Sequence, residues 1–387
     1  MTVETSDEPT PYVEEVFGGE KTGVEIEQIG TAGDGQIADP WDPEKIRVST
    51  KNFSLRNVLD MIDSDDLDLA PDFQRNRVWK PRQKSRLVES LLLQIPLPAF
   101  YFAEDTDGML RVVDGLQRLS TIHGFVRNRE FALTDLEYLT NQQGDHFDDL
   151  PPALQRRLNN AQIVVHVIDP TTPPDVKYDI FKRINTGGEP LNSMEIRHCM
   201  SRARSRAFLK RCAQNDAFYT ATGGALWEHV RMHDRESVLR FLAFRLLGDI
   251  ESYDKFGSLE RLLDRTVADL DDETRVDDVQ LEQLYADFDA AMIKCHDLFG
   301  RHTFRKWPLG SDYRSPINRA LLESWAVTLI EVPSSHLAAH SDRIVQDTRR
   351  AMTSDYAYID SISSSTGDPR RVTTRFRTAA TIVGYDA

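Results

Sequence analysis

The stretch with the most evident chemical potential is residues 110–121, LRVVDGLQRLST. Its first residues predict a short strand, which ends at an Asp-Gly pair, and apolar residues with helical spacing follow. A helix that begins directly after a glycine leaves its first backbone N–H groups unpaired, and such groups favour a phosphate. Gly115 allows an oxygen to approach the backbone closely, and Arg118 could grip phosphate oxygens with its planar fork. Gln117 and Thr121 are four residues apart, so both could face the same ligand.

Spacing alone leaves a second interpretation open. An Asp-Gly pair followed by a helix with an arginine is also typical of a plain strand–turn–helix with a surface arginine, which would bind nothing. If the turn does bind a ligand, its residue types indicate that the ligand is an anion.

The string Asp114–Thr121 resembles the DGQQR signature of a prokaryotic domain family in the ParB/sulfiredoxin superfamily. That domain forms the N-terminal half of GmrSD-type, modification-dependent restriction enzymes and related phage-defence proteins. The resemblance implies binding and hydrolysis of a nucleoside triphosphate with Mg²⁺. Asp114 would then hold the metal, Gln117 would orient the attacking water, and Arg118 would neutralise phosphate charge in the transition state.

Residues 73–79 resemble another motif of that family, an extended Gln-Arg pair followed by a tryptophan. The resemblance implies that Gln74 and Arg75 share the nucleotide with Arg118. The alternative is an Arg75 that pairs with an acid such as Asp114 and joins the strand to the turn.

Residues 181–188, FKRINTGG, resemble a third motif. Asn185 would bind a base or ribose, and Gly187 and Gly188 would let the ligand lie on bare backbone. A helix that simply ends at Gly187, with the glycine pair as a hinge, has the same pattern.

One position departs from the family. Leu116 stands where the family usually has glutamine and where sulfiredoxin-like proteins carry their reactive cysteine. Leucine cannot act as a thiol nucleophile, so the sequence excludes sulfinic acid reduction. The sequence leaves open whether leucine at this position reduces nucleotide affinity or turnover.

Three functions therefore remain in competition. The first is nucleoside-triphosphate hydrolysis in defence against foreign or modified DNA. The second is a metal-dependent DNA endonuclease at the same site, which would need more carboxylates than Asp114 alone. The third is a non-catalytic module that senses nucleotide and binds DNA or a partner protein. Because residues 1–387 contain no HNH nuclease pattern, a separate nuclease subunit is an expected partner.

The order of patterns predicts an α+β protein in which a small ParB/sulfiredoxin-like mixed α/β domain precedes an all-α domain. The expected domains are an acidic disordered tail over 1–45, a nucleotide-binding domain over 46–190 and a helical domain over 191–387. Strands are expected at 46–53, 97–103, 110–113 and 163–168. Helices are expected from residue 55, from Pro81 to about 93 and after residue 115, and then near 174–185, 191–201, 203–214, 234–247, 257–269, 279–299, 315–330 and 335–351.

Charge is distributed unevenly. The chain carries a net charge of −15, and residues 1–45 hold twelve acidic against two basic residues, a net −10. Such a segment favours a solvated tail, and a tail that mimics nucleic acid and blocks a basic groove is the alternative. An acidic chain does not coat DNA by charge alone, yet a local groove remains open at the basic residues of 72–86: Arg75, Arg77, Lys80, Arg82, Lys84 and Arg86.

Compartment signals are simple. Three scattered cysteines without a C-x-x-C pair favour a reducing, cytoplasmic location. The most apolar helical pattern, near 238–247, is too short for a membrane span and contains two arginines. We therefore expect no membrane association.

Overall fold

A computed structural model describes residues 13–27, 47–69, 79–105, 107–184 and 191–385. The chain divides into two compact units. The first contains the described residues from 47 to Met200, and the second joins residues 13–27 to the residues from Ser201 onward. The expected mixed α+β organisation, a sheet-containing region followed by a helical one, is confirmed. The boundary lies at 200/201, about ten residues beyond the expected one.

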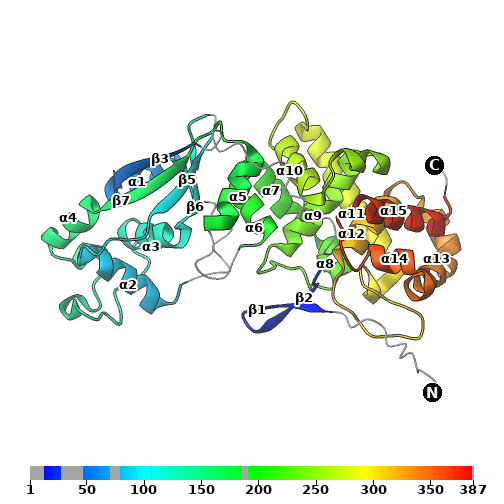
Figure 1. Ribbon diagram of the computed structural model, residues 1–387. Coiled ribbons are helices and arrows are strands. Elements are labelled where there is room, and N and C mark those ends of the chain that lie inside the picture. The colour runs from blue at the N-terminus through cyan, green and yellow to red at the C-terminus, as the bar shows by residue number, and fades with distance from the viewer. Residues whose placement is uncertain (1–12, 28–46, 70–78, 106, 185–190, 386–387) are drawn as a thin grey trace, which may run out of the picture. The chain divides into compact units, whose positions relative to one another are not determined.

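The first unit is built on a five-stranded mixed sheet (Figure 1). The strand order is β3-β7-β5-β6-β4, with β5 antiparallel to β6 and parallel to β7. The hairpin expected from the Asp107-Gly108 turn is therefore present. The bounds are β3 Val48–Ser54, β4 Leu67–Asp68, β5 Phe100–Glu104, β6 Leu110–Asp114 and β7 Gln162–Ile168.

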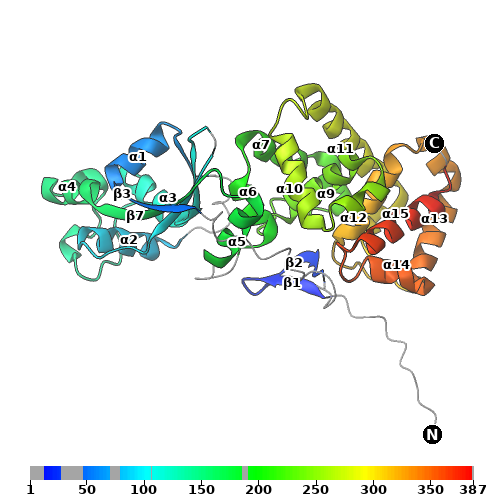
Figure 2. The same ribbon diagram turned by 45° about the horizontal axis from the view of Figure 1, so that its top comes forward.

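Alternation along the strands fixes which face each side chain covers. Phe102 and Val112 belong to a large apolar core shared with α1 Leu55–Asp63, α2 Pro81–Leu92, α3 Leu116–Val126 and α4 Pro152–Asn160. Ala103 and Val113, one residue further along, join a smaller core with α5 Pro174–Ile184 and α6 Ser193–Met200. The sheet thus lies between two helical layers, as Figure 2 also shows.

Local signals explain where these helices begin. Ser54 caps α1 by accepting a hydrogen bond from the backbone N–H of Asn57, and Pro81 occupies the first turn of α2. The last turn of α3 is joined to the end of α1 by a hydrogen bond between His123 and Asp63, whose Nε2 and Oδ1 atoms are 2.8 Å apart.

The second unit is helical. Helices α9, α11 and α12 contact one another at its centre, and α15 packs against α12. The bounds are α7 Ala203–Ala213, α8 Asp216–Thr222, α9 His233–Leu247, α10 Leu259–Leu270, α11 Asp278–Phe299, α12 Arg319–Ile330, α13 Ser334–Ser354, α14 Tyr356–Ser361 and α15 Pro369–Val383.

Residues 13–27 correct the expectation of a disordered tail over 1–45. They form a β-hairpin of β1 Glu14–Phe17 and β2 Glu20–Glu25 that packs on the helical unit. The backbone N–H of Glu25 donates to the carbonyl of Ile317 at 2.9 Å, and the N–H of Ile317 donates to that of Gly23 at 2.8 Å. Composition misled here because the acids have specific cationic partners, described below.

Two further points complete the comparison. Helices α4, α8, α14 and α15 and the short strand β4 were not among the expected elements. Within the described residues, no helix combines the length and the apolar character needed to cross a bilayer.

Candidate functional site

The centre of the candidate site is the turn from β6 into α3. Strand β6 ends at Asp114, Gly115 has φ 96° and ψ 8°, and α3 begins at Leu116. This left-handed conformation favours glycine strongly, which explains the residue type. Gly115 has no side chain to cap α3, so the first backbone N–H groups of the helix lack a side-chain cap.

Phe100 of β5 lies directly against this turn. A Cβ atom placed on Gly115 would be 2.2 Å from Cδ1 of Phe100 and 3.1 Å from Nη2 of Arg118. The glycine is thus required twice, by its backbone angle and by the close approach of the ring. Nothing in the sequence distinguished Phe100 from its apolar neighbours in the strand, and its role was missed.

Arg118 lies in the first turn of α3, and its side chain extends back to Asp114 at the end of β6. Its Nη2 donates to Oδ2 of Asp114 at 2.8 Å and to the carbonyl of Ala99 at 3.2 Å, and its Nη1 donates to the carbonyl of Pro98. The guanidinium also lies over the ring of Phe100, 4.2 Å from its centroid. The expected proximity of Arg118 to the glycine is therefore present, together with backbone contacts that the sequence could not indicate.

These contacts use three of the five N–H donors of the guanidinium, and two remain for a ligand within the described part of the chain. The side chain is 13% exposed. Burial lowers the pKa of Arg118, and the charge of Asp114 opposes that shift. Arginine stays protonated through such a change, so the turn carries a fixed positive charge beside its carboxylate.

Gln117 and Thr121 lie one turn apart on α3. The Oε1 atom of Gln117 is buried and has no hydrogen-bond partner among the described residues. A buried acceptor of this kind calls for a donor from a ligand or a water. Thr121 is 5% exposed, so its hydroxyl is not open to solvent.

Leu116 belongs to the apolar core with α1 and α2 and is 8% exposed. At this position the side chain turns into the protein and away from any solvent-borne ligand. The substitution of leucine for the usual family glutamine therefore fills the core.

The remaining predicted contacts lie outside the described residues: Gln74, Arg75, Asn185, Gly187 and Gly188. Asp114 was also expected to hold Mg²⁺, but its Oδ2 atom already accepts from Arg118. No group of three His, Cys, Asp or Glu side chains suited to a metal occurs in the described part of the chain. The described residues do not by themselves fit a resident metal ion, and magnesium stays a prediction.

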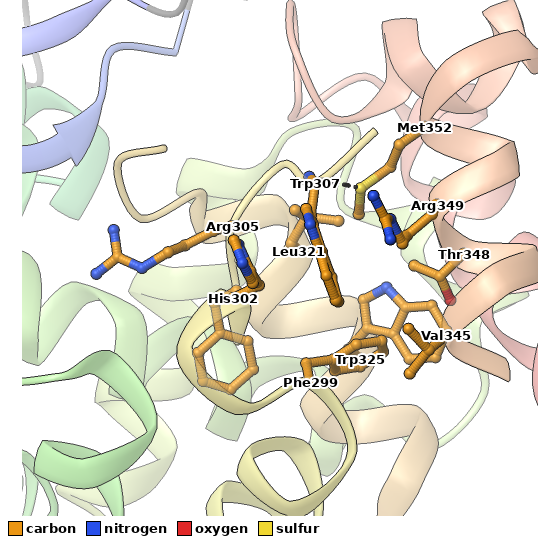
Figure 3. A pocket seen from close by; sticks show the side chains of 11 residues that line it. Phe299, His302, Arg305, Trp307, Leu321, Trp325, Val345, Thr348, Arg349 and Met352 are labelled. Carbon is orange, nitrogen blue, oxygen red and sulfur yellow. Dashed lines mark hydrogen bonds between the residues drawn. The ribbon is translucent and has the colours of Figure 1, made fainter. Parts of the chain in front are cut away.

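A second concave region lies in the helical unit (Figure 3). Trp307 is stacked on His302 with ring centroids 4.1 Å apart, and Arg349 lies 4.3 Å from the indole centroid on the other side. Both faces of the indole are thus covered, and Phe299 and Trp325 supply apolar walls. The region has no carboxylate among its lining residues, and the imidazole of its one histidine, His302, is stacked on Trp307.

Residues 55–200 match the family described as the GmrSD restriction endonuclease, N-terminal domain. The match runs from α1 to α6 and so covers the sheet unit except β3, including the turn at Gly115. No curated protein and no solved structure matches the chain significantly.

Proposed function

We propose that the domain over residues 55–200, which matches the N-terminal domain of the GmrSD restriction endonuclease, binds and hydrolyses a nucleoside triphosphate at the start of α3. The match supports a role in restriction and defence against foreign DNA. Hydrolysis would act as the switch of that response.

The observation that carries the proposal is the position of Arg118. Its guanidinium stands beside the uncapped start of α3, whose first backbone N–H groups favour a phosphate. The ring of Phe100 fills the space beside Gly115, so the phosphate would contact the first turn of α3 and not the bare backbone of the glycine. Among the described residues, the Nε–H and one N–H of Nη1 remain as donors, and each could reach a separate phosphate oxygen. Charge that develops on the phosphoryl group would be stabilised by a cation whose position is already fixed, so no reorganisation is needed.

Two neighbouring residues have supporting roles. Asp114 holds the guanidinium in place through a 2.8 Å hydrogen bond and is a positioning residue. The unpartnered Oε1 of Gln117 could accept a hydrogen bond from the attacking water and so orient it. Magnesium would enter on the triphosphate, since this ion is commonly held by substrate phosphates with few protein ligands.

A second candidate is nucleotide sensing without hydrolysis. It is favoured by the engagement of Asp114 with Arg118, which leaves the motif without a free carboxylate to act as a base. In that case bound nucleotide would only set the conformation of the chain.

The test measures nucleotide binding and phosphate release from each NTP, with Mg²⁺, with and without DNA. Arg118→Ala and Arg118→Lys are compared with wild type, and Arg129→Ala serves as the control. Arg129 is an exposed arginine paired with Asp148, so its removal changes the charge equally. We expect release to fall roughly 10²–10³-fold in Arg118→Ala and to stay unchanged in Arg129→Ala.

Other outcomes separate the candidates. Nucleotide binding without release in wild type would support sensing alone. Metal-dependent plasmid cleavage without NTP turnover would support the nuclease. Release that survives in a folded Arg118→Ala protein would refute the assigned role of Arg118, and unchanged thermal unfolding of Arg118→Lys keeps the test independent of folding.

A further inference from the structure

The N-terminal hairpin contributes three glutamates to the interior of the helical unit. Glu15 accepts from Nε2 of His233 at 2.6 Å, Glu25 pairs with Nζ of Lys306 at 2.5 Å, and Glu27 binds Arg240 through both oxygens at 2.6 and 2.7 Å. Figure 2 shows the hairpin, β1 and β2, against this unit.

The glutamates balance a charge that the helices leave uncompensated. The helical unit contributes five basic groups: Arg240, Arg319, Arg375, Lys306 and His233. Its own acids in the same region are two, Glu236 and Glu323. Basic groups thus outnumber the acids of the helices, and the three hairpin carboxylates offset this excess. Lys306 pairs with Glu25 separately from the other four groups, which share carboxylates with one another.

The pKa of His233 depends on its neighbours. Burial and the charge of Arg319 lower it, but contacts with Glu15 and Glu236 outweigh them and raise the pKa of His233. Contacts with His233, Thr22 and Arg319 outweigh the effect of burial on Glu15 and lower its pKa to about 2. The Glu15 carboxylate is therefore ionised where it meets the helical unit.

Apolar contact adds little to this attachment. Val24 is buried, whereas Val13, Val16 and Ile26 of the same segment are each more than 40% exposed. A segment held by carboxylates on arginine, lysine and histidine resembles, in its chemistry, a run of phosphates on the same groups. The bidentate contact between Arg240 and Glu27 is the geometry that arginine also offers to phosphate.

We propose that the cationic seat formed by Arg240, Arg319, Lys306 and His233 is a binding site for a nucleic-acid backbone, which the acidic hairpin occupies in this structure. The hairpin acts as an internal competitor. Nucleic acid binds when it displaces the three glutamates, and the exchange keeps the buried cations paired. The inference rests on the helical unit alone and does not depend on the nucleotide site at Gly115.

The test is carried out on the full chain. The variant E15Q/E25Q/E27Q removes the competing charges, and a short fluorescent oligonucleotide, single-stranded or duplex, reports binding by anisotropy. We expect affinity to rise by at least roughly tenfold, with log K falling against log salt at a slope of about −2 to −3, as for three phosphate contacts. Adding Lys306→Gln should reverse part of the gain.

The control E20Q/D254N/D297N changes the net charge by the same amount at three exposed carboxylates, and it should leave binding as in wild type. An equal gain in this control, or no gain in a folded triple glutamine variant, would overturn the proposal. A gain for polyglutamate but not for the oligonucleotide would point to an acidic protein partner and would also overturn it.

A second measurement covers the case in which the triple variant does not fold. In wild type, hydrogen exchange at the amides of Glu25 and Ile317 reports the docked hairpin, because each donates across the contact. A saturating oligonucleotide should accelerate exchange at both positions. Binding that leaves these amides fully protected would place nucleic acid elsewhere.

Discussion

Replacing Gly115 by alanine is the sharpest perturbation of the turn before α3. The backbone at this residue has φ 96°, and the added Cβ would lie 2.2 and 2.7 Å from two carbons of the Phe100 ring. Aromatic ring carbons cannot move aside as the end of a flexible chain can. We therefore expect two separate penalties, one from the backbone and one from packing.

The two contributions can be sized. A left-handed conformation costs an L-residue roughly 1–2 kcal/mol, and overpacking in a filled core typically costs about 1–3 kcal/mol. Their sum, about 2–5 kcal/mol, is large against the stability of a typical domain. Because Arg118 lies 3.1 Å from the same position, relief of the clash should also displace its guanidinium and weaken nucleotide binding.

Gly108→Ala is the matched control. Gly108 has φ +86°, close to the angle at Gly115, but a Cβ there would meet no atom within 4 Å. The control therefore carries the backbone penalty without the clash. The difference between the two variants isolates the contact with Phe100.

Calorimetry of the full chain, with hydrogen exchange to assign each transition to its unit, measures the effect. An excess of 1–3 kcal/mol should lower the Tm of the sheet unit by roughly 2–12 °C more in Gly115→Ala than in Gly108→Ala. Equal Tm values for the two variants would show that the ring does not press on the turn, and the account of the site would then be wrong.

Three further outcomes are expected. Glu89→Gln should destabilise the sheet unit by about 1–3 kcal/mol in calorimetry. The charged Oε1 accepts from three consecutive backbone N–H groups, and an amide would remove the charge and place an N–H donor where Oε2 accepts from Glu137; no loss would contradict this. Arg375→Met should cost about 3–5 kcal/mol in urea unfolding, since it leaves the fully buried Glu323 with only the longer 3.5 Å contact to Arg240, whereas the double change Arg375→Met/Glu323→Leu should recover much of the loss. The pKa of Glu15 and of Glu27 is lowered to about 2 in the folded chain. Their contribution to stability is therefore full above the ordinary pKa near 4.5 and is lost as the pH falls toward 2. Hydrogen exchange in the hairpin, corrected for intrinsic rates, should accelerate between about pH 5 and pH 3, and exchange that does not change over this range would refute the prediction.

The regular elements were largely predictable because their signals are local. Ser54, Pro81 and the Asp107-Gly108 turn marked the start of α1, the start of α2 and the β5–β6 hairpin, and the structure confirms all three. Periodicity also indicated most helices of the second unit. It did not indicate the position of β7 between β3 and β5, since strand order is set by contacts between distant segments.

The candidate site was predictable in part. Residue types and spacing indicated that Arg118 would lie beside Gly115, and it does. They could not indicate that the carbonyls of Pro98 and Ala99 would take two of its donors, because backbone acceptors have no sequence signature. For the same reason the hairpin of 13–27 escaped prediction: its glutamates are paired with residues more than 200 positions away.

That separation has a consequence for synthesis of the chain. Strand β2 emerges from the ribosome early, but its partner Ile317 follows 292 positions after Glu25. At about 5–20 residues per second, translation leaves the acidic strands without their seat for roughly 15–60 s. In that interval the sheet unit can complete its own folding, because it lies in the sequence between the N-terminal hairpin and the helices to which the hairpin binds.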